Sequence, residues 1–146
     1  MRVLIVAVGR VKPPGLREAI DEYLARVRRH LPIEEIEIDD GADRSISASM
    51  RKRIPSGARL VALDLGGQRC DSERFARWLE RTGSQGKGII AFVIGGARGL
   101  PADVLARVDE RLSLSPMTFP HRIARLLLAE QIYRATTILR GEPYAK

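Results

Sequence analysis

Three short runs of this chain are apolar at nearly every position, and they constrain the fold more than any other feature. They are RVLIVAVG (Arg2–Gly9), RLVALDL (Arg59–Leu65) and KGIIAFVIGG (Lys87–Gly96). Near-continuous β-branched and aliphatic runs of this length are typical of strands buried on both faces of a parallel sheet. The sequence therefore predicts a largely parallel sheet flanked by helices.

Amphipathic segments alternate with these strands. Apolar residues at helical spacing, capping residues and proline or glycine stops predict five helices. They are Leu16–His30, the short basic segment Ile46–Ile54, a helix capped by Asp71 or Ser72 that runs through Arg81, Pro101–Val108, and Pro120–Arg140. Strands that alternate with helices along the whole chain indicate an α/β fold.

Two further segments are predicted as strands. IEEIEI (Ile33–Ile38) alternates apolar and acidic residues, as a strand near the edge of a sheet does. The run RLSLSP contains a last strand, Leu112–Ser115, that ends at a proline. Between the strand at Arg59–Leu65 and the following helix, the letters GGQRC predict a turn.

Size and charge limit the classes of protein that fit. The 146 residues, 45% of them hydrophobic, suffice for one domain over residues 1–146. Twenty-five Lys plus Arg against eighteen Asp plus Glu give a formal charge of +7, so the chain should attract polyanions. Nucleic acid is the obvious candidate partner, although basic solvated faces are common in proteins without that role.

Cysteine and histidine are scarce. Cys70 is the only cysteine, and His30 and His121 are the only histidines, too few for a disulfide framework or a closed zinc site. The apolar run Val3–Val8 is too short for a signal-peptide core or a membrane span. We therefore expect a cytoplasmic protein with no metal and no membrane partner.

Three segments lie where an α/β sheet binds its ligands, at the carboxyl ends of strands. They are the glycine pair at 66–67, GGARGLP at 95–101 and SPMTFPH at 115–121. The chain contains neither GxGxxG nor GxxxxGK[ST], so a phosphate-binding loop is poorly supported. The stretch GGARGLP by itself is better explained as a structural turn from a strand into a helix than as a phosphate-binding loop.

The segment SPMTFPH is apolar where loops are normally polar. Pro116 and Pro120 fix the backbone on either side of Met117 and Phe119. Met117 and Phe119 could simply fill the core. Alternatively, the segment could form a rigid wall whose backbone groups bind a flat, uncharged heterocycle such as adenine.

The last helix is apolar around most of its circumference. Leu126, Leu127, Leu128 and Ala129 are consecutive. A helix with more than one apolar face needs burial on two sides, which favours a homodimer. Glu130 and Arg134 are spaced for an ion pair between successive turns.

Several segments together resemble a known family. They are VLIVAVGRVK, LVALDLGGQ, FVIGGARGL and LSLSPMTFPHRIARLLLAEQIYRA followed by LRGEPYAK. In this order they resemble the ribosomal large-subunit RNA pseudouridine N3-methyltransferases, small enzymes of the SPOUT superfamily that use S-adenosylmethionine. The resemblance covers essentially the whole chain. It implies an α/β domain whose C-terminal segment forms a trefoil knot, a rare exception to the rule that chains do not knot.

The resemblance also assigns a cofactor site. In the family, the methyl donor lies between three loops, which implies binding by Leu63, Gly95, Leu114, Ser115, Pro116, Met117, Thr118 and Phe119. A sulfonium nucleoside has no phosphates and needs apolar walls and backbone hydrogen bonds, so the missing phosphate loop agrees with it. We expect Gly95→Val to weaken donor binding by placing a side chain where the ligand lies.

The implied reaction is transfer of the methyl group to N3 of a pseudouridine in 23S rRNA of the assembled large ribosomal subunit. Because the N3 proton must leave, we expect a basic group near the base. The candidates are His121, Tyr144 and Arg134. The candidate phosphate contacts are Arg122, Arg125 and Lys146.

Two positions depart from the family pattern. Relatives usually end in Tyr-His followed by Lys or Arg, whereas this chain ends in Tyr144, Ala145 and Lys146. This change leaves open a catalytically impaired, ribosome-associated RNA-binding protein that keeps the cofactor pocket. Arg98 stands where relatives often carry an acidic or neutral residue. A flavodoxin-like nucleotide binder is a third, weaker alternative.

Overall fold

A five-stranded sheet forms the centre of the protein, and every strand pairing in it is parallel. The computed structural model describes residues 1–144. The strands are β1 (Arg2–Val8), β2 (Ile33–Ile38), β3 (Arg59–Arg69), β4 (Ile89–Ile94) and β5 (Glu110–Ser113), in the spatial order β2-β1-β4-β3-β5. The prediction of a largely parallel sheet is confirmed, and IEEIEI occupies the edge that its alternation predicts.

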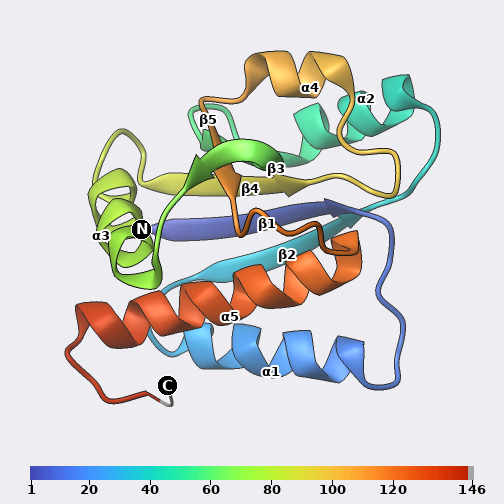
Figure 1. Ribbon diagram of the computed structural model, residues 1–146. Coiled ribbons are helices and arrows are strands. Elements are labelled where there is room, and N and C mark those ends of the chain that lie inside the picture. The colour runs from blue at the N-terminus through green and yellow to red at the C-terminus, as the bar shows by residue number, and fades with distance from the viewer. Residues whose placement is uncertain (145–146) are drawn as a thin grey trace.

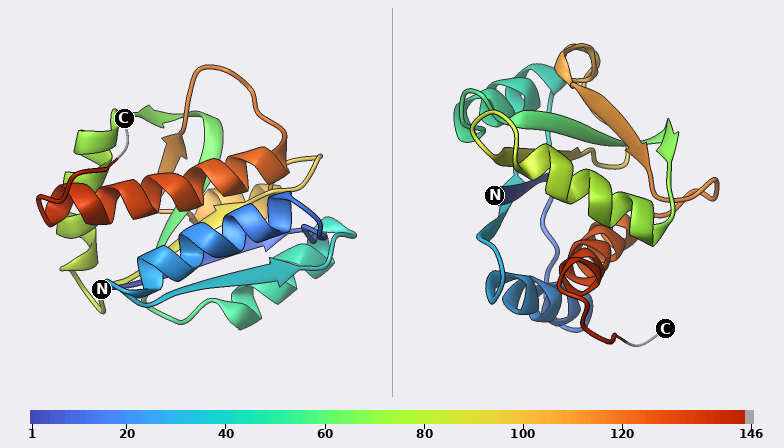
Figure 2. Two further views of the ribbon diagram at one scale, coloured as in Figure 1. Left: turned by 90° about the horizontal axis from the view of Figure 1, so that it is seen from below. Right: turned by 90° about the vertical axis from the view of Figure 1, so that its left-hand side faces the viewer.

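Helices cover both faces of the sheet and complete a three-layer α/β fold. They are α1 (Leu16–Arg28), α2 (Asp43–Arg53), α3 (Ser72–Gly83), α4 (Ala102–Arg107) and α5 (His121–Leu139). Helices α1, α3 and α5 pack on one face, and α2 and α4 pack on the other (Figures 1 and 2). All five predicted helices are present, with α2 beginning three residues earlier than expected.

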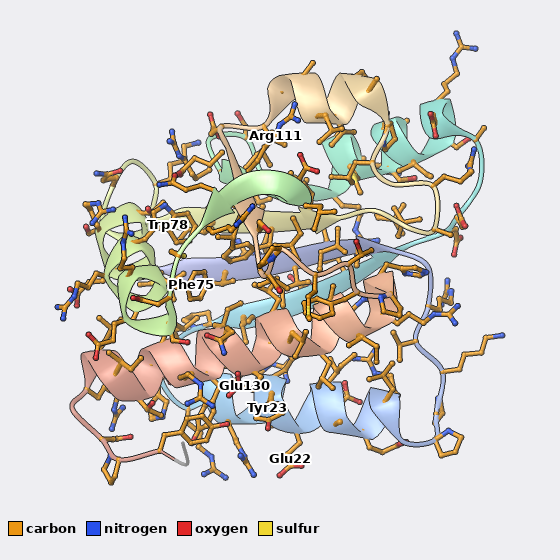
Figure 3. The ribbon with its side chains drawn as sticks, viewed as in Figure 1. Glu22, Tyr23, Phe75, Trp78, Arg111 and Glu130 are labelled. Carbon is orange, nitrogen blue, oxygen red and sulfur yellow. The ribbon has the colours of Figure 1, made fainter. Side chains whose placement is uncertain are left out.

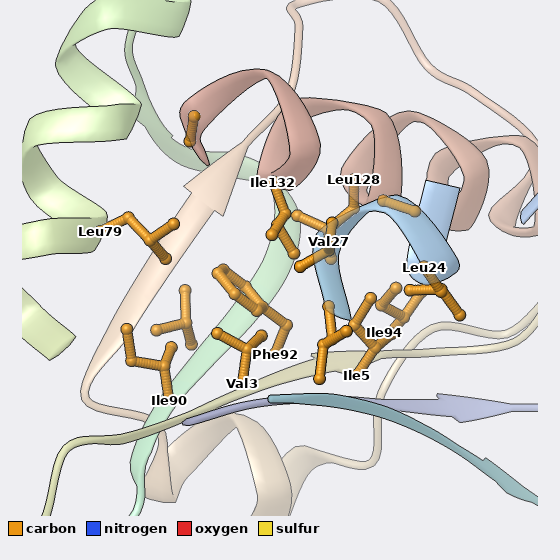
Figure 4. Packing of buried hydrophobic residues seen from close by; sticks show 14 of the residues in the cluster. Val3, Ile5, Leu24, Val27, Leu79, Ile90, Phe92, Ile94, Leu128 and Ile132 are labelled. Carbon is orange, nitrogen blue, oxygen red and sulfur yellow. The ribbon is translucent and has the colours of Figure 1, made fainter. Parts of the chain in front are cut away.

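The buried strands divide their side chains between two cores. In β1, Val3, Ile5 and Ala7 face the core under α1, α3 and α5, while Leu4, Val6 and Val8 face the core under α2 and α4. All six are at most 1% exposed. Figure 4 shows the first core, where Val3 and Ile5 pack with Phe92 of β4 and Leu128 of α5. Burial on both faces explains why the sequence of β1 lacks the alternation of a half-exposed strand.

The segment GGQRC is not the predicted turn. Strand β3 continues through it to Arg69, and Gln68 and Arg69 pair with β5 after a register shift that begins at Leu63. A Cβ atom on Gly67 would lie 2.7 Å from the carbonyl carbon of Arg111. Glycine here allows two backbones to approach closely, a role that the letters GG do not distinguish from a turn.

Local capping follows the sequence at α3. The Asp71 side chain accepts a hydrogen bond from the backbone N–H of Arg74 at 2.8 Å, which confirms one of the two predicted N-caps.

Strand β5 ends at Ser113, two residues before the predicted end, so Leu114 and Ser115 belong to the loop that follows. Within residues 1–144, no helix has the length and apolar character needed to cross a membrane.

Candidate functional site

A cavity of about 380 Å³ lies beside β3, β4 and β5, which are neighbours in the sheet. Its walls come from three segments, namely Leu63–Leu65 within β3, the loop that follows β4, and the loop between β5 and α5. The three segments meet because the pairing of β3 with β4 ends at Ala62, so Leu63–Leu65 lie beside the carboxyl ends of β4 and β5. The cavity is therefore at the position where an open α/β sheet binds ligands.

The cavity brings together most of the predicted cofactor residues. Leu63, Gly95, Leu114, Ser115, Met117, Thr118 and Phe119 line it, whereas Pro116 does not. Leu63, Leu114 and Phe119 are half-buried and supply apolar wall. A cavity of this volume with apolar side chains in its wall has room for an adenosyl group.

Hydroxyl groups fold the loop between β5 and α5. The Ser113 hydroxyl donates to the carbonyl oxygen of Ser115 at 2.9 Å, and the Ser115 hydroxyl oxygen accepts from the backbone N–H of Met117 at 3.0 Å. Met117 is 72% exposed, so it does not fill the core. Met117 therefore lacks the core-filling role that one interpretation of the sequence gave it, and the half-buried Phe119 lines the cavity. Binding of a heterocycle by this loop stays a prediction.

The structure gives a different reason for glycine at position 95 in the cavity wall from the contact with the methyl donor that the sequence predicts. A Cβ atom at this position would lie 2.4 Å from the carbonyl carbon of Gly99 and 2.6 Å from the backbone nitrogen of Leu100. The Cβ would meet the protein's own backbone, so Gly95→Val would distort the loop and would not cleanly test ligand contact. The expectation that the added side chain would simply occupy ligand space is therefore wrong.

His121 is the predicted catalytic residue that the structure brings to the cavity. It is the first residue of α5, and its Nδ1 atom is buried without a hydrogen-bond partner. Burial lowers the pKa of the imidazole, the positive charges of Arg122 and Arg125 lower it further, and Asp40 opposes them. A neutral imidazole ring whose buried nitrogen has no partner can form a hydrogen bond with a bound molecule.

Tyr144 and Arg134 lie elsewhere and do not line the cavity. The Tyr144 hydroxyl donates to Glu130 at 3.0 Å, and its ring lies 4.4 Å from the Arg134 guanidinium. Glu130 accepts from Arg134 at 2.7 Å, as the spacing predicts. Burial and hydrogen bonds to Tyr23 and Glu130 raise the pKa of Tyr144. Figure 3 shows Glu130 on α5 and Tyr23 on the adjacent α1.

The candidate phosphate contacts differ in their exposure to solvent. Arg122 is exposed at the start of α5. Arg125 is only 1% exposed, and its guanidinium donates to Glu37 at 2.5 Å, to Glu35 at 3.2 Å and to the carbonyl oxygen of Gly9 at 3.0 Å. A buried, neutralised guanidinium offers nothing to RNA, so the assignment of Arg125 is corrected. Lys146 and the departure at Ala145 lie outside the described residues.

Arg98 and the acidic partners of Arg125 are features of the structure that were not predicted from the sequence. Arg98 lines the cavity, donates to the carbonyl oxygen of Gly41 and lies 4.0 Å from Asp43. It thereby ties the loop after β4 to the start of α2. The signal for the Arg125 pairing was an arginine inside an apolar helix together with two acidic residues in a half-buried strand.

No group of three or more potential metal ligands occurs within residues 1–144. The cavity itself contains one carboxylate, Asp64, and one imidazole, His121. Asp64 is already paired with Arg111 at 3.2 Å. The donor set of the cavity suits an organic heterocycle better than a metal ion.

Comparison with known proteins gives matches over the full chain. Residues 1–145 match the family described as "Predicted SPOUT methyltransferase". The chain is 56% identical over 145 residues to "Ribosomal RNA large subunit methyltransferase H" of Sorangium cellulosum, covering 99% of each protein. It is 43% identical to the protein of the same name from Gemmatimonas aurantiaca, covering 100% of each.

Solved structures share the fold at low identity. A probable methyltransferase from Bordetella pertussis Tohama I gives a TM-score of 0.57 at 15% identity, covering 92% of this chain and 93% of that one. TrmJ from Z. mobilis ZM4 gives 0.54 at 15% identity, covering 100% of this chain and 73% of that one. Both support the same α/β architecture, while the trefoil knot stays a prediction.

Proposed function

Because this chain belongs to the SPOUT methyltransferase family, we propose that it transfers the methyl group of S-adenosylmethionine to N3 of a pseudouridine in 23S rRNA of the assembled large ribosomal subunit. The observation that carries the proposal is the cavity where seven of the eight expected donor-binding residues meet. The flavodoxin-like alternative is not retained, because the whole chain matches a methyltransferase family.

The residues around the cavity support binding of a sulfonium nucleoside. Leu63, Leu114 and Phe119 would hold the adenosyl group, and the two folded turns at Ser113 and Ser115 fix the wall that faces it. When bound, the donor supplies an electrophilic methyl group. A rigid wall raises the rate because nucleophile, methyl carbon and sulfur must lie in line.

The reaction also requires that the proton on N3 of the base be removed. As the bond from N3 to the methyl carbon forms and the bond from sulfur to that carbon breaks, the N3 proton leaves the base. We infer that the His121 imidazole takes up this proton while the sulfur leaves as the neutral thioether of S-adenosylhomocysteine, because the ring lines the cavity and its Nδ1 has no hydrogen-bond partner among residues 1–144. Arg122, exposed beside it, would contact RNA phosphate.

Tyr144 and Arg134 are proposed to act from the second subunit of a homodimer, because they do not line the cavity of their own chain. Leu65, Met117 and Ile123 are exposed apolar residues in the cavity walls and the first turn of α5. They offer apolar surface for such a contact. We further propose that the protein acts in the cytoplasm, on ribosomes.

The test separates donor binding from turnover. Calorimetry with S-adenosylhomocysteine should show binding, and labelled S-adenosylmethionine should transfer its label to ribosomes that lack the modification. Digestion of the RNA and mass spectrometry should locate the label at N3 of pseudouridine. Absence of both donor binding and transfer would overturn the proposal.

Binding without transfer would support the second candidate, a catalytically impaired RNA-binding protein. The residue that favours this candidate is Ala145, at a position where the family resemblance implies histidine. Ala145→His should then raise the rate of label transfer strongly. Robust transfer by the natural chain, unchanged by Ala145→His, would eliminate the impaired protein.

A further inference from the structure

A basic groove lies beside α3 and β5, apart from the cofactor cavity. We define the arginine groove by Arg74, Trp78 and Arg81 of α3, Gln68 of β3 and Arg111 of β5. These residues line a hollow of about 170 Å³. In Figure 3, Trp78 lies on α3 and Arg111 on the neighbouring strand. None of them contributes to the cavity that holds the expected donor-binding residues.

The groove carries uncompensated positive charge. Arg74, Trp78 and Arg81 follow one another at spacings of four and three residues, so they share one face of α3. Arg74 and Arg81 are exposed, and neither has an ion-pair partner among residues 1–144. Seven residues of helix separate them by about 10 Å, a distance that allows contact with two different phosphates of one strand.

The acidic groups nearest the groove are already engaged. Glu110 accepts from the Trp78 indole N–H at 3.0 Å and pairs with Arg59 at 3.2 Å. Asp64 pairs with Arg111 at 3.2 Å. Asp71, next to the groove residue Cys70, accepts a hydrogen bond from the backbone N–H of Arg74 at 2.8 Å as the N-cap of α3. With these carboxylates engaged, Arg74 and Arg81 leave the groove with an excess of positive charge.

Trp78 provides a rigid aromatic surface between these two cations. Its ring stacks on Phe75 with centroids 5.7 Å apart and contacts Phe92 at 5.9 Å, while the bond to Glu110 fixes its edge. The residue remains only half-buried. An immobilised aromatic ring flanked by guanidinium groups is the combination by which proteins bind single-stranded nucleic acid, through base stacking and phosphate contacts.

A third hollow adjoins both the groove and the cofactor cavity. A hollow of about 380 Å³ lies between them and shares Cys70 and Leu112 with the groove. The same hollow shares Leu114 and Phe119 with the cofactor cavity. The three hollows therefore adjoin common residues, and in our proposal the RNA extends from the cofactor cavity past the middle hollow to Trp78.

We propose that the arginine groove binds the single-stranded RNA that flanks the methylated nucleotide. The proposal rests on the proposed function for the identity of the substrate. RNA is favoured over an acidic peptide because Trp78 supplies a stacking surface in addition to charge. The groove would set the affinity for the RNA and leave the chemistry at the cavity unchanged.

The experiment uses Trp78 as its own reporter, because it is the only tryptophan in the chain. A single-stranded, uridine-rich RNA oligonucleotide is titrated into the full protein while the indole fluorescence is followed. Quenching should saturate, and the affinity should fall as salt rises. In Arg74→Gln/Arg81→Gln, we expect about tenfold weaker binding and a salt slope smaller by about 1.4, from two lost phosphate contacts.

The matched control is Lys52→Gln/Arg53→Gln on α2, which removes the same charge from exposed positions on the opposite face of the sheet. With unmethylated ribosomes as substrate, Arg74→Gln/Arg81→Gln should raise KM about tenfold. It should leave kcat and the affinity for S-adenosylhomocysteine unchanged. Circular dichroism verifies that both double variants fold.

Three outcomes would overturn the proposal. The first is unchanged RNA affinity in Arg74→Gln/Arg81→Gln. The second is an equal loss of RNA affinity in that variant and in Lys52→Gln/Arg53→Gln. The third is tighter binding of a polyglutamate peptide than of RNA. The fluorescence titration requires no methyl transfer. Quenching by RNA in a protein that transfers no label would therefore leave the groove intact and refute only the proposed reaction.

Discussion

At the scale of single residues, the most consequential side chain is one that touches no cavity. Arg125 emerges from α5 into a network with Glu35 and Glu37 of β2 and the carbonyl oxygens of Val8 and Gly9 at the end of β1. Arg17 of α1 joins the same two carboxylates. A single guanidinium thus holds the beginning of α5 against the sheet, one turn from His121.

Removing this guanidinium should cost far more than removing an exposed one. We expect Arg125→Met to lower the free energy of unfolding by about 3 kcal/mol, because it leaves the half-buried carboxylates of Glu35 and Glu37 with fewer partners. Urea denaturation measures the loss. Arg122→Met, at an exposed position in the same turn, should change stability by less than about 0.5 kcal/mol. Equal effects would contradict the buried network.

The pKa of His121 gives a second test at this scale. Its imidazole should titrate below the ordinary histidine value of about 6.5, because burial and the neighbouring arginines disfavour the charged form. In the unfolded chain the ring takes up its proton at the ordinary value. The histidine's contribution to stability is therefore complete above about pH 6.5 and is lost as pH falls toward the folded pKa.

Nuclear magnetic resonance can follow this titration in a His30→Gln background, which leaves one histidine. Arg122→Gln should move the midpoint upward by removing one of the charges that lower it. A midpoint at or above about 6.5 in the His30→Gln protein would contradict the burial of the ring.

At the scale of elements, the pairing of β3 with β5 depends on close backbone contact. Gly67 lies against the backbone of Arg111 and Leu112. A Cβ atom on Gly67 would lie 2.7 Å from the carbonyl carbon of Arg111 and from the backbone nitrogen of Leu112. Its neighbour Gly66 has open space, since the nearest atom to an added Cβ is an Asp64 carboxylate oxygen at 3.9 Å. Two adjacent glycines in one strand therefore have different roles.

This difference predicts unequal costs for the same substitution. Gly67→Ala should lower the free energy of unfolding by about 1–3 kcal/mol, because β3 and β5 must separate to admit the methyl group. Gly66→Ala should change it by about 0.5 kcal/mol or less. Both are measured by urea denaturation. A larger cost at Gly66 would refute the register of these two strands.

Helix α5 also has a different environment from the one that its sequence suggested. Its apolar surface packs between α1 and α3 of the same chain, with Leu128, Ala129, Ile132 and Ala135 in the shared core. Figure 2 shows α5 beside both helices. Much of the apolar surface that favoured a homodimer is thus covered within one chain, so the dimer stays a proposal supported by the placement of Tyr144 and Arg134.

At the scale of the whole molecule, the homodimer can be tested together with the catalytic roles. Sedimentation should give twice the mass of the 16.2 kDa chain. If Arg134 of one subunit completes the cavity that contains His121 of the other, then His121→Gln and Arg134→Gln should each abolish transfer alone. Mixing the two after reversible dissociation should restore about a quarter of the sites, by random pairing in a two-fold dimer.

The mixed sample must be compared with each variant treated alone. Restoration would require that the two residues act across the subunit contact, since no single chain in the mixture contains both. A mixed dimer with no activity would place any role of Arg134 in its own subunit. A mass equal to one chain would refute the dimer directly.

Much of the fold and site follows from sequence because the relevant signals are local. Uninterrupted apolar runs identify β1 and β4 as buried strands, and Asp71 marks the start of α3. The loops that line the cavity could be named because consecutive parallel strands end at the same edge of a sheet. The family resemblance then selected residues such as Leu63 and Phe119 within those loops.

Only the tertiary structure decided features that depend on segments far apart in the chain. Sequence could not show that β3 continues past Gly67, because the pairing partner is β5. Nor could it show that Arg125 is buried against Glu37, 88 residues away. Periodicity reports which face of an element avoids water, whereas burial of a charge depends on which distant group neutralises it. The sequence therefore determined the elements and their order, and three-dimensional packing determined which charges remain free to bind.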